Sequence, residues 1–145
     1  SSVSVLNLQT LAHLVSDDSR GFDAKIRQTL GAFSSRAGQM GRSVPMMLAA
    51  LSTYHSGMPQ VVIVDSQAED TEALKTVLRT AYVPTAIVMT VLPQHREVLA
   101  RLLPWIGSMK AVDGRATAYV CRDFACQIPA TSAGQLEEQL RSVRL

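Results

Sequence analysis

The feature that most constrains the fold is a change in hydrophobic period near Pro59. Before it, apolar residues recur at helical spacing; after it come two short β-branched runs, QVVIVD (residues 60–65) and TAIVMTV (residues 85–91). A helical stretch separates these runs, and a strand–helix–strand sequence packs as a right-handed βαβ unit. We therefore predict a helical segment, residues 1–57, followed by a small α/β module, residues 58–145.

The helical segment is expected to hold three helices. Pro45 opens the third, with Ser43 as its cap, in the order that favours a helix start. The apolar residues that define the first two helices are Leu8, Leu11, Ala12 and Val15, then Phe22, Ile26, Leu30 and Phe33. A segment of this length is small for an independent core. We therefore expect these helices either to cover one face of the sheet or to belong to a larger set of helices that this chain lacks.

The α/β module is expected to continue beyond its βαβ unit. Ser66 and Glu69 have the spacing of a capping box before the helix that separates the two strands. Pro93 opens another helix, TAYVC and ACQIP form a β-hairpin, and Thr131 or Ser132 caps a last helix. The predicted fold class is α+β, or α/β, with a mostly parallel sheet and one hairpin.

Composition excludes several classes of protein. Hydrophobic residues make up 47% of the chain, enough for a substantial core, and the net charge of +2 comes with no clustered basic face, which argues against a nucleic-acid binder. No apolar run is long enough to span a membrane, and the N-terminus lacks the pattern of a secretory signal. We expect a cytoplasmic chain, and the absence of an initiator Met suggests a processed or excised piece.

The two cysteines, Cys121 and Cys126, are the main candidates for chemistry. A four-residue hairpin loop would place them opposite each other with their Cβ atoms about 4.5–5.5 Å apart, so a disulfide could form with modest adjustment. They are either a redox-sensitive cross-strand pair or two small, buried, inert residues. Their spacing excludes a thioredoxin-type Cys-x-x-Cys site.

No metal or cofactor site is expected. A closed zinc site needs four ligands, and none of His13, His55 and His95 lies at ligand spacing from the cysteines. The acidic turn after the first strand has no glycine-rich phosphate loop. Its residues Asp65, Glu69 and Asp70 are better explained as complements to a helix dipole.

Methionines gather around the third helix. They are Met40, Met46, Met47 and Met58. Methionines at such spacing usually belong to a core, although they also form adaptable binding surfaces. If the neighbours of this helix are absent, exposed apolar helix faces would promote self-association.

The C-terminal third, DGRATAYVCRDFACQIPATSAGQLEEQL, resembles the end of the spermatogenesis-associated, thioredoxin-domain-containing protein family. The matching residues are Asp113, Gly114, Ala116 to Cys121, Cys126, Pro129, Thr131 and Leu136. QVVIVD and the N-terminal SSVSVLNLQTLAHL are also similar to this family. Asp123 stands where the family pattern has Asn, and Ala130 stands where it has Val.

The resemblance implies a much longer parent protein. Its members carry a thioredoxin-like domain and a helical barrel like that of N-acylglucosamine epimerases, and this chain corresponds to their tail. Residues 1–57 would then be the last helices of the barrel. The expected partners are the barrel and the thioredoxin-like domain of the same protein, with no nucleic acid and no membrane.

Three functions remain open. The first is a structural or interaction module without a complete active site. The second is a redox module in which Cys121 and Cys126 relay to the thioredoxin-like domain. The third is a wall of a sugar-processing barrel.

Overall fold

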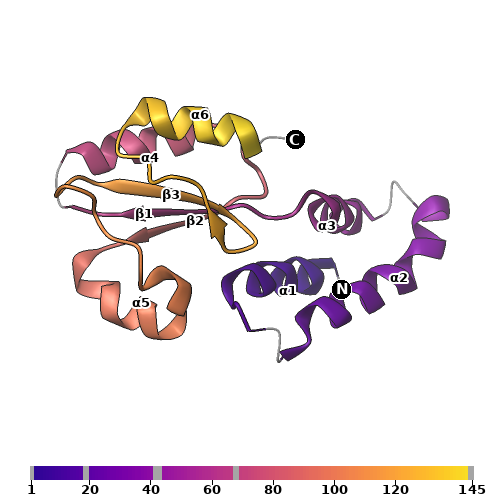
Figure 1. Ribbon diagram of the computed structural model, residues 1–145. Coiled ribbons are helices and arrows are strands. Elements are labelled where there is room, and N and C mark those ends of the chain that lie inside the picture. Colours follow the sequence, from indigo (N-terminus) through magenta and orange to yellow (C-terminus); the bar gives the residue numbers. More distant parts are fainter. Residues whose placement is uncertain (1, 18–19, 41–43, 67–68, 144–145) are drawn as a thin grey trace. The chain divides into compact units, whose positions relative to one another are not determined.

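The computed structural model describes residues 2–17, 20–40, 44–66 and 69–143. Backbone contacts divide the chain into two compact units, Ser1–Met58 and Pro59–Leu145 (Figure 1). We call them the helical unit and the sheet unit and describe each by itself.

The helical unit consists of α1 (Ser2–Leu14), α2 (Phe22–Met40) and α3 (Pro45–Ser56). Its core residues come from all three helices: Val5, Ile26, Leu30, Met47 and Ala50. The predicted face of the second helix is confirmed, since Phe22, Ile26 and Leu30 are buried. Pro45 opens α3 as predicted, whereas Ser43 lies outside the described residues.

The predicted face of α1 is partly correct, since Leu8 and Ala12 pack against the core. Leu11 is 42% exposed, whereas Gln9 is 1% exposed. Gln9 Nε2 donates to the carbonyl oxygen of Ala50 in α3 at 2.8 Å, so a polar side chain joins the two helices inside the core. Hydrophobic periodicity could not place Gln9 in the core, because a buried amide with a hydrogen-bond partner is still a polar residue in the sequence.

Within its described residues, the sheet unit combines four strands with three α-helices, and a short 3-10 helix lies on either side of α5 in the chain. In chain order the elements are β1 (Gln60–Val64), α4 (Asp70–Thr80), β2 (Ile87–Val91), η3 (Pro93–His95), α5 (Arg96–Leu102), η4 (Pro104–Ile106), β3 (Thr117–Arg122), β4 (Ala125–Cys126) and α6 (Ala133–Val143). The single helix predicted after Pro93 is therefore broken, and Pro104 accounts for its end because proline cannot continue the hydrogen-bond ladder of a helix.

The sheet has four strands in the order β2-β1-β3-β4. The fold class is α+β as predicted, but the expectation of a mostly parallel sheet needs correction. Only β1 and β2 are parallel, while β1–β3 and β3–β4 are antiparallel. A tight turn at Asp113 and Gly114, both with positive φ, reverses the chain shortly before β3 and brings it back beside β1 in the opposite direction.

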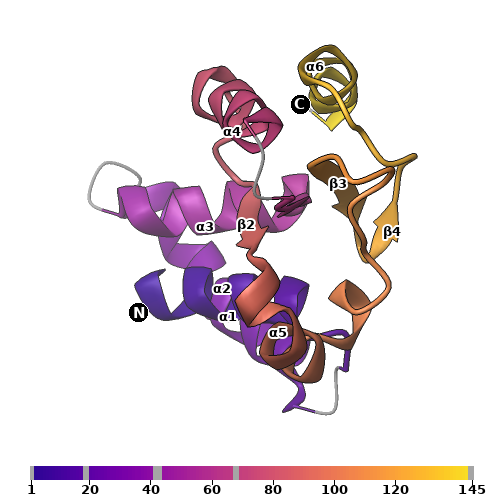
Figure 2. The ribbon, with the colours of Figure 1, turned by 90° about the vertical axis from the view of Figure 1, so that its left-hand side faces the viewer.

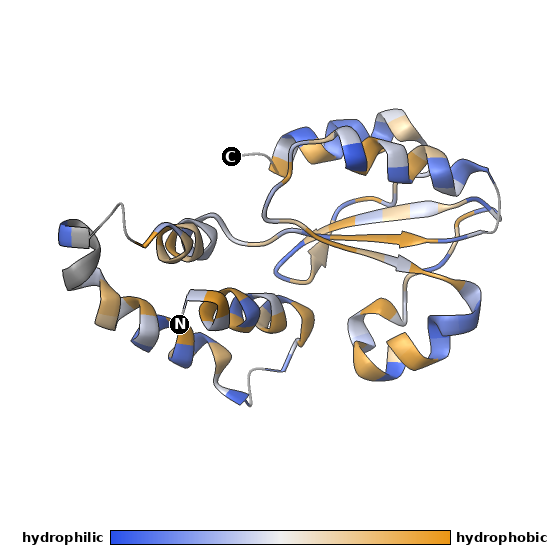
Figure 3. Cartoon of the chain, turned by 180° about the vertical axis from the view of Figure 1, so that it is seen from behind, coloured by the Kyte–Doolittle hydropathy of each residue, from blue (hydrophilic) through white to orange (hydrophobic). Residues whose placement is uncertain are grey.

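Helices cover both faces of β1 and β3, which is why β1 is buried along its whole length. Figure 2 shows α4 and α6 on one side of the sheet and α5 on the other. One core cluster joins Val61 and Ile63 to α4 and α6, and the other joins Val62 and Val64 to the α5–η4 segment. In Figure 3, β1 is correspondingly orange along most of its length, the strands beside it are paler, and the helices alternate between orange and blue. A continuous apolar run such as QVVIV is typical of a strand covered in this way.

The two predicted helix caps have different outcomes. Ser132 caps α6 through its Oγ, which accepts from the N–H of Gln135 at 3.4 Å, and Gln135 Oε1 accepts from the N–H of Thr131. The capping box at Ser66 and Glu69 is wrong. α4 begins at Asp70, and Glu69 makes no side-chain cap hydrogen bond.

Candidate functional site: the cysteine hairpin

The hairpin that carries both cysteines is closed by a two-residue turn and not by the expected four-residue loop, because Arg122 pairs with Ala125. Asp123 and Phe124 have φ values of 49° and 65°, and a hairpin turn of type I′ has positive φ at both central positions. Asp tolerates this conformation, whereas a bulky residue such as Phe124 adopts it rarely. The register that results places Cys121 directly opposite Cys126.

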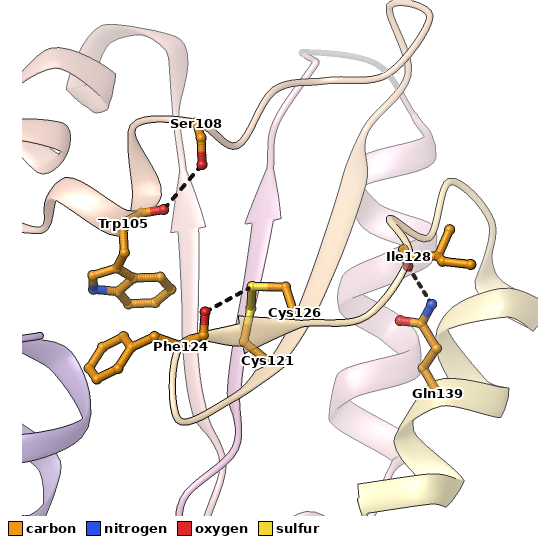
Figure 4. Close-up of a disulfide and its surroundings, with 7 residues drawn as sticks. All are labelled: Trp105, Ser108, Cys121, Phe124, Cys126, Ile128 and Gln139. Carbon is orange, nitrogen blue, oxygen red and sulfur yellow. Dashed lines mark hydrogen bonds between the residues drawn. A yellow bond between two sulfur atoms is a disulfide. The ribbon is translucent and has the colours of Figure 1, made fainter.

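Cys121 and Cys126 are joined by a disulfide, with an S–S distance of 2.04 Å and a Cα–Cα distance of 3.9 Å (Figure 4). The N–H of Gln127 donates to the carbonyl oxygen of Val120 at 2.9 Å, so the cysteines occupy the next, non-hydrogen-bonded position. Facing side chains are closest at such positions. The backbone pairing therefore brings the two cysteines to the position where facing side chains are closest.

The two ends of the disulfide lie in different surroundings. Cys121 is 1% exposed and packs in the core cluster with Val62 and Ile106, whereas Cys126 lies on the exposed edge strand β4. The expectation that both cysteines are buried is therefore wrong for Cys126. Redox activity of the pair stays a prediction.

An aromatic pair lies beside the turn. The rings of Trp105, from η4, and Phe124 are 5.5 Å apart between centroids and meet edge to face, with an interplanar angle of 70° (Figure 4). Such pairs contribute about 0.5–1.5 kcal/mol beyond the area that they bury. This contact ties the strained turn to the segment after α5. Sequence reasoning missed Trp105 because no local pattern relates it to the hairpin.

Side chains of α6 hold the chain after β4. Gln139 Nε2 donates to the carbonyl oxygen of Ile128 at 2.6 Å, and Gln127 Nε2 donates to Ser142 Oγ at 3.1 Å. A shallow groove of about 400 Å³ lies between this segment and α6. The side chain of Ile128 at its rim is 82% exposed.

The acidic residues after β1 act in local structure. Asp70 Oδ2 accepts from the N–H of Ala116 at 2.8 Å and its Oδ1 accepts from Ser66 Oγ, while Asp65 Oδ1 accepts from Thr71 Oγ1 at 2.6 Å. Asp70 thus links the start of α4 to the start of β3. The carboxylate of Asp70 therefore does more than complement the helix dipole, because it also accepts a hydrogen bond from the backbone N–H of the buried residue Ala116.

The described part of the chain contains no group of three or more His, Cys, Asp and Glu side chains that could hold a metal ion. Its helices also include none that is long and apolar enough to cross a membrane.

Of the methionines near α3, Met47 is buried, Met46 is 48% exposed and Met58 is half-buried. The side chain of Met40 lies outside the described residues.

Comparison with known proteins gives one consistent relationship. The chain is 34% identical over 112 residues, 77% of its length, to spermatogenesis-associated protein 20 of Homo sapiens. Identity to the proteins of the same name is 33% for Rattus norvegicus and 34% for Mus musculus over the same share of the chain. The chain belongs to the spermatogenesis-associated protein 20 family. This confirms the family resemblance drawn from TAYVC, Cys126 and the flanking residues.

The match covers only 14% of the length of each of these relatives. The chain therefore corresponds to a piece of a much longer protein in this family. No family model matches the chain. No solved structure matches it either.

Proposed function

We propose that the sheet unit is a redox-responsive, non-catalytic module of a longer protein, in which Cys121 and Cys126 form a reversible disulfide. The observation that supports this most is the direct opposition of the two residues across β3 and β4, with one sulfur buried and the other at the surface. The same hairpin register would accommodate both oxidation states, because the two-residue turn and the β3–β1 pairing do not depend on the S–S bond.

The exchange chemistry follows from the difference in exposure. A thiolate from solution reaches the sulfur of Cys126, forms a mixed disulfide there and releases the Cys121 sulfur; a second thiolate then frees Cys126. Overall the protein takes up two electrons and two protons, while two thiols become one disulfide. In the longer protein, we propose the thioredoxin-like domain expected for this family as the exchange partner.

The test is a redox titration of the 145-residue chain in glutathione buffers, read by intact mass after acid quenching. We expect a reversible mass change of two protons within the range of cytosolic glutathione potentials. Trp105 is the sole tryptophan, so its fluorescence gives a second signal from beside the hairpin. Glutathione should form a trapped mixed disulfide with Cys126 in the Cys121→Ser variant, and much more slowly with Cys121 in the Cys126→Ser variant.

Two results would contradict the proposal. One is a disulfide that stays oxidised in the native chain at every attainable glutathione ratio and opens only after denaturation. The other is a pair of thiols that never oxidises. The first would make the bond a purely structural cross-link.

We propose a second role for the helical unit, as part of a larger helical assembly in the parent protein. Four large apolar side chains on α1 and α3 are exposed: Val3, Leu11, Met46 and Leu48. In a larger assembly, such exposed apolar side chains would be covered by neighbouring elements. The barrel wall expected from the family resemblance is the form of assembly that we propose.

This second role predicts concentration-dependent self-association of the isolated chain. In sedimentation velocity, the mean mass should rise with concentration, and the double variant Leu11→Lys, Leu48→Lys should remain monomeric. Exposed side chains tolerate such changes at little cost in stability, so circular dichroism should be unchanged. A wild-type chain that stays monomeric at its highest soluble concentration would argue against an uncovered assembly surface.

A further inference from the structure

The two edges of the sheet differ in their protection. β4 has only two residues, and the disulfide ties it to β3. β2, at the other edge, is five residues long, IVMTV, with no charge, proline or glycine in it. Natural proteins usually protect such an edge with charges, proline or a bulge. Within the described residues, none of these devices is present on β2.

The backbone of β2 alternates between its neighbour and the open side. The N–H of Ile87 donates to the carbonyl oxygen of Pro59 at 2.8 Å, and the carbonyl oxygen of Val91 accepts from the N–H of Asp65 at 3.0 Å. The odd-numbered residues of β2 therefore turn their backbone N–H and C=O groups toward β1. In a parallel pair, the residues between them point both groups the other way. Val88 and Thr90 therefore present two donors and two acceptors at the outer edge.

A groove lies beside this edge on the α4 face of the sheet. It has a volume of about 330 Å³ and is lined by Ile63, Lys75, Leu78, Arg79, Val88 and Thr90. Val88 is 49% exposed, so the apolar floor of the groove is open. Outward backbone groups and adjacent space for side chains are the two features that strand addition uses.

The rim of the groove is basic. Lys75 and Arg79 both bind the single carboxylate of Glu72, at 2.8 and 3.2 Å. Their hydrogen bonds, that of Lys75 first, lower the pKa of the Glu72 carboxyl below its ordinary value. Two cations sharing one carboxylate leave an excess positive charge. A second copy of β2 would bring like charges together, whereas an acidic strand would complement the rim.

We propose that the outer edge of β2 binds an extended acidic peptide segment of a partner protein as a fifth strand. The backbone of the segment pairs with Val88 and Thr90, and its carboxylates lie beside Lys75 and Arg79. β2 and β4 are opposite edges of the sheet, so this interaction does not depend on the redox behaviour of the hairpin.

The test measures fluorescence anisotropy of a labelled peptide about eight residues long, roughly one strand, in which valine and glutamate alternate. The partner is the full 145-residue chain. A peptide with lysine in place of glutamate is the matched control. We expect the glutamate peptide to bind, with an affinity that falls as salt rises, and the lysine peptide to bind about tenfold more weakly or not at all.

Two variants separate strand pairing from charge. Val88→Pro removes the backbone N–H that points to the outer edge and leaves the hydrogen bonds between β2 and β1 in place, because an edge position tolerates proline. It should weaken binding about tenfold or more. Arg79→Glu changes a largely exposed side chain and should weaken binding severalfold, whereas Arg101→Glu on α5, at the other face, should leave it unchanged.

Several results would overturn the proposal. They are absence of binding at about 1 mM peptide, equal binding of the lysine peptide, or full binding by the Val88→Pro variant. A dimer of the free chain that Val88→Pro dissociates would also overturn it, because a second copy would then occupy the edge.

Discussion

Replacing Leu136 with alanine should lower the free energy of unfolding of the sheet unit by about 2–5 kcal/mol. Leu136 is fully buried on α6 and belongs to the core cluster that joins α4, α6, β1 and β3. Its truncation removes apolar contacts and leaves a cavity that a sheet packed on both faces cannot easily close. Urea unfolding followed by Trp105 fluorescence measures the effect, since the sole tryptophan lies in this unit.

The matched control is Leu102→Ala. Leu102 is 68% exposed at the end of α5, so the same chemical change should shift stability by less than about 0.5 kcal/mol. Similar losses for the two variants would mean that α6 does not pack on the sheet as the structure has it.

Removing the disulfide should have the second-largest effect, and its size should depend on which cysteine is replaced. The bond closes a short loop, with a sequence separation of 5, for which the chain-entropy model gives about 2 kcal/mol. Cys126→Ser should cost about that amount, because Cys126 is exposed. Cys121→Ser should cost about 1–3 kcal/mol more, because it also places a hydroxyl in an apolar core.

Urea unfolding with and without a reductant checks this ranking. The reductant should lower the wild-type midpoint to that of Cys126→Ser and leave that variant unchanged. Equal midpoints for the two serine variants would contradict the difference in burial. A wild-type midpoint that the reductant does not change, with reduction verified by mass, would show that the bond does not stabilise the native state.

Local patterns predicted much of the fold. The apolar run QVVIV, the start of α3 at Pro45 and the Ser132 cap depend on residues close together in the chain. The opposition of Cys121 and Cys126 is also local, because hairpin pairing determines it once the turn is known.

Two of the incorrect predictions share a cause. Leu11 is exposed and Gln9 buried because α3 supplies a hydrogen-bond acceptor that the sequence of α1 cannot reveal. The predicted capping box at Ser66 fails because the Ser66 hydroxyl donates to Asp70 Oδ1, while the other oxygen of that carboxylate accepts from Ala116, 46 residues further along the chain. In both cases a distant residue takes part in the hydrogen bonding that replaces the local pattern.

The sequence by itself determined the order of helices and strands and the position of the two cysteines opposite each other, since periodicity and turn geometry act over a few residues. Only the tertiary structure decided that β3 lies antiparallel beside β1, that Cys121 is buried while Cys126 is exposed, and that β2 keeps an open edge. These features depend on which distant elements cover which face of the sheet, and that outcome is set by packing across the whole unit.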